Sequence, residues 1–226
     1  MQTARIHTYA HNVNNVMVMG RTDVYVNRRP KAPPTENGCF CPLIEGEPGC
    51  VAGCMNRALN VECVAGLCAC GVHCTNQRFQ RRSYAAVMPF RTADRGWGLV
   101  ALEDIARGRF VVEYVGEVVD AAELARRVEA RGRGGGAGHF YYLALDGAHE
   151  TLDAARRGNL ARFINHSCAP NCVTERWQVL GEWRVGVFAR THIAAGTELT
   201  FDYHLHSFGG AKVPCRCGAP KCRGFI

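Results

Sequence analysis

The eight-residue stretch NHSCAPNC, from Asn165 to Cys172, combines amide, imidazole and thiol groups in one short segment. A stretch this polar is unsuited to a core strand, and its side chains are suited to hydrogen bonding and metal ligation. Its two thiols, Cys168 and Cys172, are part of a total of thirteen cysteines. The chemistry of the segment therefore depends on what the remaining cysteines do.

Eight cysteines form a first cluster between Cys39 and Cys74, in a segment with few large apolar side chains. Such a segment cannot build its own hydrophobic core, so we expect it to fold around metal. In a chain without a signal peptide, this cysteine density indicates zinc ligation rather than disulfides. Two tetrahedral zinc ions need eight ligand positions, or seven thiolates if one sulfur bridges both ions, and the cluster can supply either.

A second cluster, Cys215, Cys217 and Cys222, offers only three ligands near the end of the chain. Either Cys168 or Cys172 can provide the fourth, which would hold the tail over the NHSC segment. A site closed by four thiolates has no open position for water, so this zinc is predicted to be structural rather than catalytic.

Length and composition predict a globular protein with one sizeable core, since 47% of the 226 residues are hydrophobic. No apolar signal region and no run of eighteen apolar residues is present, which predicts an intracellular protein without a membrane partner. The net charge of +7 favours an anionic partner. For the basic clusters at 78–82, 126–133 and 156–157, a solvated surface and contact with a DNA backbone are equally good interpretations.

The order of patterns predicts four regions. These are an N-terminal arm over 1–36, the cysteine-rich segment over 37–83, a domain over 84–205 and a tail over 206–226. The domain has short β-rich runs broken by Gly and Asp, and an amphipathic helix over 121–130 with Leu124 and Val128 four residues apart. A glycine run follows and ends that helix. An α+β fold that is mostly β accounts best for this pattern.

Five motifs, in this order, resemble those of the SET-domain protein-lysine methyltransferases: GWGL (96–99), EYVGEV (113–118), RFINHSCAPNC (162–172), ELTFDY (198–203) and CRCGAPKCRG (215–224). The first cysteine cluster is similar to the AWS segment that precedes SET in the Ash-one, NSD and Set-two types. That subgroup is associated with methylation of lysine 36 of histone H3. The resemblance implies a SET fold of small curved β-sheets with knot-like C-terminal threading, flanked by zinc-bound AWS and post-SET segments.

The resemblance also implies the site residues and S-adenosylmethionine as the methyl donor. Tyr203 would be the catalytic residue. The cofactor pocket would be lined by Arg95, Gly96, Trp97, His139, Phe140, Tyr141, Asn165 and His166. Three structural zinc ions would be held by Cys39, Cys41, Cys50 and Cys54, by Cys50, Cys63, Cys68 and Cys74, and by Cys168, Cys215, Cys217 and Cys222, with Cys70 left over.

Methyl transfer from a sulfonium to an amine needs alignment and a neutral lysine nitrogen, which an apolar channel favours by disfavouring the charged form. Tyr114, Tyr141 and Phe201, with Tyr203, are the expected channel lining, and their faces can receive the ammonium group. Phe201 has no hydroxyl to hold a water that would crowd out further methyl groups, so we predict more than monomethylation. The glycines beside Trp97 favour a cofactor contact for its ring, whereas Trp177 and Trp183 are predicted core residues.

The predicted partners are the histone H3 tail and a nucleosome, contacted in part through the DNA backbone, by a monomeric catalytic unit in the nucleus. Two rival interpretations remain. One is an inactive SET-like scaffold that binds nucleosomes, which would be marked by a broken tyrosine, asparagine or tail cluster. The other is a methyltransferase for another histone or non-histone lysine, because specificity depends on the channel rim rather than on the catalytic residues. The loop over 204–214 is predicted to lie across the substrate channel.

Overall fold

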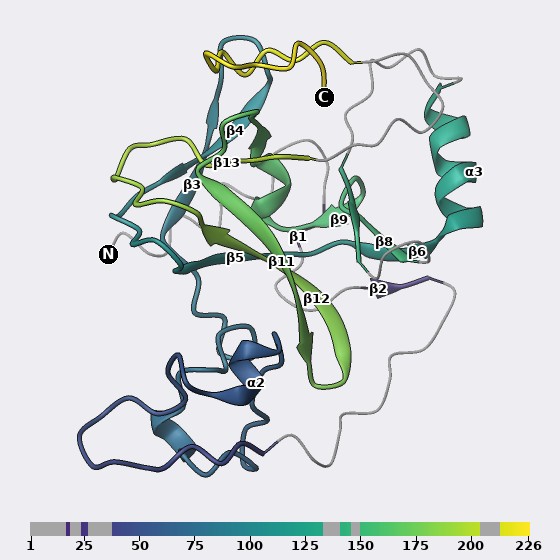
Figure 1. Ribbon diagram of the computed structural model, residues 1–226. Helices are drawn as coiled ribbons and strands as arrows, with labels where there is room; N and C mark the ends of the chain where they lie inside the picture. The colour runs from purple at the N-terminus through teal and green to yellow at the C-terminus, as the bar shows by residue number, and fades with distance from the viewer. Residues whose placement is uncertain (1–16, 19–23, 27–37, 133–140, 146–149, 204–212) are drawn as a thin grey trace.

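The computed structural model describes residues 17–18, 24–26, 38–132, 141–145, 150–203 and 213–226 (Figure 1). Within these residues the fold is mostly β, as the sequence predicted. The strands are β1 (Met17–Val18), β2 (Val24–Tyr25), β3 (Val87–Arg91), β4 (Trp97–Ala101), β5 (Phe110–Tyr114), β6 (Glu117–Asp120), β7 (Tyr142–Ala144), β8 (Glu150–Asp153), β9 (Arg157–Gly158), β10 (Asn165–His166), β11 (Cys172–Val179), β12 (Glu182–Ala189) and β13 (Thr200–Phe201). The helices are α2 (Met55–Ala58), α3 (Ala121–Gly132) and the short 3₁₀ turns η2 (Gly71–His73) and η3 (Leu160–Phe163).

The longest strands, β11 and β12, form an antiparallel hairpin whose second strand pairs with β5. Every residue of β5 is buried, as expected for a strand covered on both faces. Phe79, from the end of the cysteine-rich segment, packs against Phe110 of β5 at 4.5 Å between ring centroids. Gly186 of β12 lies under these rings, where a Cβ atom would come within 2.6 Å of Phe79. The aromatic cluster thus joins the cysteine-rich segment to the sheet.

The second large sheet has the strand order β2–β6–β8–β7, and α3 packs beside it. The predicted helix over 121–130 is confirmed and extends to Gly132. Its Arg127 guanidinium binds the carboxylates of Glu117 at 2.9 Å, Glu123 at 2.7 Å and Asp153 at 2.8 Å. Because a fixed guanidinium fork bonds several carboxylates at once, this cluster ties the helix to β6 and β8.

The two motifs around NHSC and ELTFDY lie side by side, as predicted. β10 pairs in parallel with β13, which places Asn165 opposite Thr200 and His166 opposite Phe201. The Ser167 N–H continues the ladder by donating to the Phe201 carbonyl at 3.1 Å. The Asn171 amide donates to the Glu198 carbonyl at 2.8 Å and accepts from the Thr200 N–H at 2.9 Å. Residues about thirty positions apart are therefore fixed in one small parallel ladder.

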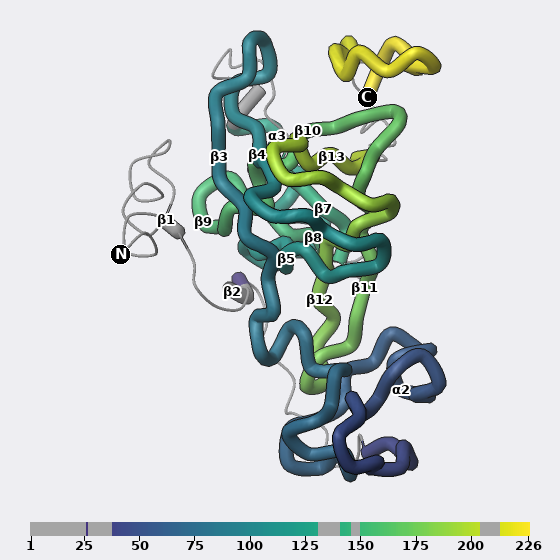
Figure 2. The backbone as a smooth tube through the Cα atoms, turned by 90° about the vertical axis from the view of Figure 1, so that its left-hand side faces the viewer, coloured from purple at the N-terminus to yellow at the C-terminus, as the bar shows by residue number. Residues whose placement is uncertain are grey.

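The two cysteine-rich segments lie at opposite ends of the molecule (Figures 1 and 2). The segment with α2 lies beside the turn of the β11–β12 hairpin, and the C-terminal segment covers the other end. The hairpin also corrects one prediction. Trp177 is buried as expected, but Trp183 is 38% exposed, because its strand extends beyond the core near the turn. No helix among the described ranges is both long and apolar enough to cross a membrane.

Candidate active site and thiol clusters

A cavity of about 450 Å³ lies between the NHSC segment, the start of β4 and the C-terminal segment. Its size is ordinary for a small-molecule site. It is lined by Arg91, Asp94, Arg95, Gly96, Trp97, Tyr141, Arg162, Phe163, Asn165, His166, Tyr203, Val213, Pro214, Cys215, Arg216, Cys217 and Ile226. All the described members of the predicted cofactor set are therefore gathered around one cavity. His139 and Phe140 lie outside the described residues, as do 204–212 of the predicted channel loop.

Asn165 is held in this wall by the carboxylate of Glu198. Its Nδ2 donates to Glu198 Oε1 at 2.8 Å and to the Trp97 carbonyl at 3.2 Å. The other oxygen of Glu198 accepts from Arg95 Nη2 at 2.9 Å. One carboxylate thereby orients two residues of the cavity that come from different segments. Glu198 was not among the predicted site residues, although its place at the start of ELTFDY was the available signal.

His166 is buried, and both of its ring nitrogens have partners in the protein. Nδ1 accepts from the Tyr203 N–H at 3.2 Å, so in the neutral ring Nε2 carries the proton and donates to Cys168 Sγ at 3.4 Å. The imidazole thus links the tyrosine to the tail thiols. In metal sites, a hydrogen bond of this kind from a neighbouring group orients the ligand that accepts it.

Trp97 gives the cavity an aromatic wall with an open polar group. The Arg91 guanidinium lies 4.4 Å from the centre of its ring, and its buried Nε1 has no hydrogen-bond partner within the described ranges. Gly96 precedes it with φ of 76°, and no atom lies within 4 Å of its missing Cβ. The flat Trp97 ring, its Nε1 donor and the accessible backbone at Gly96 together fit the adenosyl and amino-acid parts of S-adenosylmethionine.

The predicted channel side chains also meet. Phe201 lies edge-on to Tyr114 at 6.5 Å and beside Tyr203 at 5.0 Å between ring centroids. The Tyr203 hydroxyl donates to the Ile164 carbonyl at 2.8 Å, and the Tyr114 hydroxyl donates to the Tyr141 carbonyl at 3.1 Å. Burial, and then the neighbouring Tyr141, raise the pKa of Tyr203 well above its usual range. The phenol therefore stays neutral and keeps its proton.

Arg162 is a second residue of the site that was not among the predicted site residues. It is 6% exposed, and its guanidinium lies 4.0 Å from the centre of the Tyr141 ring. Its Nε donates to the Ala154 carbonyl at 2.9 Å. Burial lowers its pKa, whereas Tyr141 and other neighbours act to raise it. Arg162 therefore supports the Tyr141 ring from beneath by a cation–π contact.

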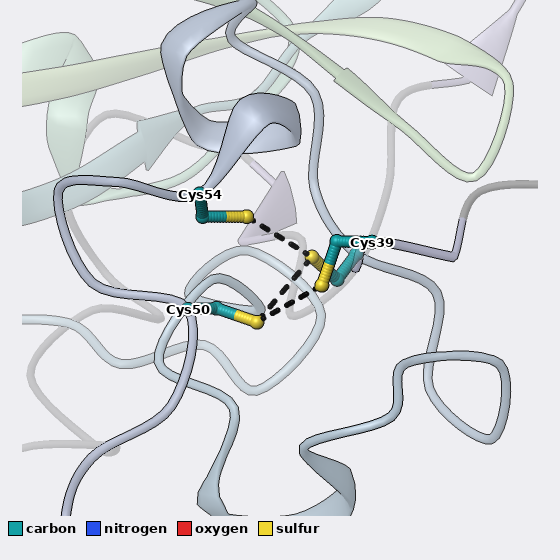
Figure 3. Close-up of side chains that lie close together, drawn as sticks. Cys39, Cys50 and Cys54 are labelled. Atoms are coloured by element: carbon teal, nitrogen blue, oxygen red, sulfur yellow. Dashed lines mark hydrogen bonds between the residues drawn. The ribbon is translucent and has the colours of Figure 1, made fainter. Parts of the chain in front are cut away.

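The thiols of the first cluster converge in the interior of the cysteine-rich segment (Figure 3). Cys39 Sγ and Cys50 Sγ lie 3.3 Å apart. Two overlapping groups have all their sulfurs within 4.8 Å of one another: Cys39, Cys50, Cys54 and Cys63, and Cys50, Cys63, Cys68 and Cys74. Sulfurs around one zinc at about 2.3 Å lie about 3.8 Å apart, so both groups match such sites.

The second of these groups coincides with a predicted set, and the first has Cys63 where the prediction had Cys41. The Cys41 thiol nonetheless lies close to this group, because burial and then the neighbouring Cys39 and Cys54 thiols raise its pKa to about 12. Arg57 donates to the Cys50 carbonyl at 2.9 Å. Arg78 lies 4.6 Å from the centre of the Trp177 ring.

In the tail, Cys168, Cys215, Cys217 and Cys222 have all four sulfurs within 4.8 Å of one another. Cys168 Sγ is 3.9 Å from both Cys215 Sγ and Cys222 Sγ. Cys172, the alternative ligand, is instead the first residue of β11 and belongs to the core, where burial raises its pKa to about 12. The four tail sulfurs thus form a compact group that suits one metal ion.

Residues 96–204 match the SET domain family, and residues 45–82 match the AWS domain family. Among curated proteins, "Histone-lysine N-methyltransferase ASHH1" of Arabidopsis thaliana is 47% identical over 190 residues, which cover 83% of this chain and 38% of that protein. "Histone-lysine N-methyltransferase, H3 lysine-36 specific" of Mus musculus is 47% identical over 189 residues, covering 83% and 7%. This chain thus spans well under half the length of either relative.

Solved structures agree on the fold. The methyltransferase domain of human "Histone-lysine N-methyltransferase SETMAR" has a TM-score of 0.75 at 27% identity, covering 93% of this chain and 88% of that one. A Chaetomium thermophilum polycomb repressive complex 2, described as autoinhibited and bound to S-adenosylmethionine, has a TM-score of 0.65 at 33% identity and covers 74% and 24%. The similarity to the first of these structures therefore extends over nearly the whole of this chain.

Proposed function

We propose that this chain, which belongs to the AWS–SET family of proteins, is a histone-lysine N-methyltransferase. Its proposed substrate is histone H3, and its proposed target residue is lysine 36. The observation that carries the proposal is that Tyr203 and Asn165 line the same cavity of about 450 Å³. Asn165 lies on β10, and Tyr203 closely follows β13, the strand that pairs with β10. The 46–47% identity to proteins named as specific for H3 lysine 36 supports the choice of lysine.

In the proposed reaction the bound cofactor, S-adenosylmethionine, supplies an electrophilic methyl group. Asn165, Arg95 and Trp97 would hold it, with the backbone beside Gly96 left open for close approach. The protein's part is positioning, because a methyl transfer in line needs aligned partners rather than a covalent nucleophile. Tyr203, which is partly buried and stays neutral, presents its hydroxyl oxygen to the reacting region.

The aromatic rings prepare the substrate nitrogen. Buried Tyr114 and Phe201 exclude water, which disfavours the ammonium form of an incoming lysine and favours the neutral amine. After transfer the nitrogen is charged, and the aromatic faces stabilise that charge by about 0.5–2 kcal/mol each. With phenylalanine at position 201 the proposal includes products beyond monomethyl-lysine.

The test is transfer of labelled methyl groups to recombinant nucleosomes that contain wild-type H3 or H3 without lysine 36, with the Tyr203→Phe enzyme as control. We expect signal only with wild-type enzyme and wild-type H3. Signal that persists without lysine 36 but needs Tyr203 would keep the enzyme and reject its site preference. Absence of signal from wild-type enzyme on nucleosomes, with full zinc content, would favour the scaffold interpretation.

The zinc proposal is three structural ions per chain, two in the AWS segment and one in the tail. The three sulfur groups support it, with Cys50 and Cys63 shared between the first two. Plasma emission measurement of the purified protein should give about three zinc per chain, and Cys222→Ser should remove about one. Loss of all zinc from that variant, or two per chain in the wild type, would contradict the assignment.

A nuclear protein that contacts nucleosomal DNA follows from the same proposal. The net charge of +7 supports it. So does the exposed Arg156, which lies near the arginines Arg126 and Arg127 of α3. Not every basic residue contributes equally, because Arg126 is bound to Glu123 at 2.6 Å. Affinity for nucleosomes should fall steeply with added salt if phosphate contacts dominate.

A further inference from the structure

A groove lies between the tip of the β11–β12 hairpin and the end of α2. These elements lie at the end of the molecule opposite the C-terminal segment (Figure 2). This hairpin groove is lined by Leu59, Asn60, Arg176 and Trp183 and has a volume of about 330 Å³. Nothing in the proposed methyl transfer uses these residues. The groove therefore needs an explanation of its own.

The groove exposes apolar surface that a folded domain would usually bury. Leu59 is 66% exposed and Trp183 is 38% exposed. Met55, one helical turn before Leu59 and so on the same side of the chain, is 70% exposed. Contiguous exposed apolar side chains with a polar rim mark interaction sites on soluble proteins.

The charged member of the groove, Arg176, has no partner among the described residues. Arg176 is exposed, and its guanidinium makes no ion pair or hydrogen bond within the part of the chain that the structure describes. None of the four lining residues is acidic. Tryptophan and arginine are also the residue types that dominate binding energy in protein interfaces. The groove thus offers a cation beside an aromatic and an aliphatic surface.

The groove is also rigid, because backbone bonds fix its two sides. The Gln178 N–H donates to the Asn60 carbonyl at 2.8 Å, and the Glu62 N–H donates to the Gln178 carbonyl at 2.9 Å. Residues 60–62 therefore add a short parallel segment to β11. A preformed surface loses little conformational entropy on binding, so a short ligand suffices.

From these features we propose that the hairpin groove is a docking site for a peptide segment of a partner protein that carries an apolar side chain next to an aspartate or glutamate. The apolar side chain packs against Leu59 and Trp183, and the carboxylate pairs with Arg176. A single cation within an apolar surface favours such a peptide over a nucleic acid, whose phosphates need several cations. The site lies away from Tyr203, so it adds affinity for the partner without taking part in methyl transfer.

The experiment uses the zinc-loaded chain and three fluorescein-labelled peptides in fluorescence polarisation. One alternates leucine or phenylalanine with glutamate, the second has lysine in place of glutamate, and the third has serine in place of the apolar residues. We expect the first to bind at least about tenfold more tightly than either of the others. Arg176→Glu should weaken it by about tenfold. Arg107 is also exposed and has no ion pair with any described residue, so Arg107→Glu should not change the binding.

Equal weakening by Arg176→Glu and Arg107→Glu would reduce the effect to overall charge and overturn the proposal. So would equal binding of the serine peptide. A short DNA duplex is included as a further ligand. If the duplex binds in a way that depends on Arg176 and the first peptide does not bind, the ligand of the groove is a nucleic acid and the peptide proposal is overturned. Hydrogen exchange of the peptide complex should protect residues 57–62 and 176–183, and protection elsewhere would place the peptide at another site. An unchanged melting temperature and zinc content will show that Arg176→Glu is folded.

Discussion

Replacing Glu198 by glutamine tests whether this carboxylate positions the cofactor wall. In the structure one oxygen accepts from Asn165 at 2.8 Å and the other accepts from Arg95 at 2.9 Å. Glutamine has the same shape, so its single carbonyl can still accept from one partner. The other partner then meets an NH₂ group, and two donors face each other.

The size of the effect follows from burial. A hydrogen bond to a charged group contributes about 1.5–3 kcal/mol, and solvent screening reduces it at exposed positions. The Arg95 and Glu198 side chains are 26% and 23% exposed, so we take the lower end of this range, about 1.5 kcal/mol. That value corresponds to about a tenfold weaker hold on the cofactor. Because the lost bond positions Arg95 and Asn165 rather than the reacting atoms, kcat should change by less than about threefold.

The assay is the steady-state rate at varied S-adenosylmethionine, together with calorimetric titration of the cofactor. Glu103→Gln is the matched control, since Glu103 also accepts from an arginine at 2.9 Å but lies on the surface away from the cavity. We expect KM for the cofactor to rise about tenfold in Glu198→Gln and to stay constant in the control. An unchanged KM and Kd in Glu198→Gln, or a fall in kcat alone, would refute the positioning argument.

Three further predictions concern packing, product and pH. Gly186→Ala places a methyl group 2.6 Å from the Phe79 ring, so it should destabilise the protein by about 1–3 kcal/mol and lower the melting temperature, and an unchanged melting curve would contradict the packing. Phe201→Tyr should shift the products seen by mass spectrometry toward monomethyl-lysine, since a tyrosine hydroxyl can hold a water, and an unchanged product ratio would count against this. Since burial raises the pKa of Tyr203, its phenol is fully protonated below its usual pKa near 10, and kcat/KM between about pH 7 and 9.5 should show no decline from its ionisation. A falling limb of kcat/KM in that range, with cofactor binding and zinc content unchanged over the same pH values, would contradict this prediction.

The sequence alone was sufficient where short-range chemistry sets the answer. Cysteine spacing predicted clusters of thiols that could bind metal, because segments with so many cysteines and so few large apolar side chains cannot build a hydrophobic core of their own. Alternating apolar runs and turn residues predicted a mostly β domain, and the four-residue spacing of apolar side chains predicted α3. The motif order predicted that NHSC and ELTFDY would meet, and the parallel pairing of β10 with β13 confirms it.

The tertiary structure decided which distant residues became partners. Both Cys168 and Cys172 were possible tail ligands, and only Cys168 lies among the tail sulfurs, because Cys172 begins β11 and turns into the core. Glu198 reaches Asn165 across 33 positions, a contact that no local pattern encodes. Trp183 was expected in the core and lies at the surface, because the hairpin extends past the core. Composition and spacing determine which kind of ligand or hydrogen-bond partner a segment needs. The path of the chain and the lengths of its strands determine which distant residue provides that partner.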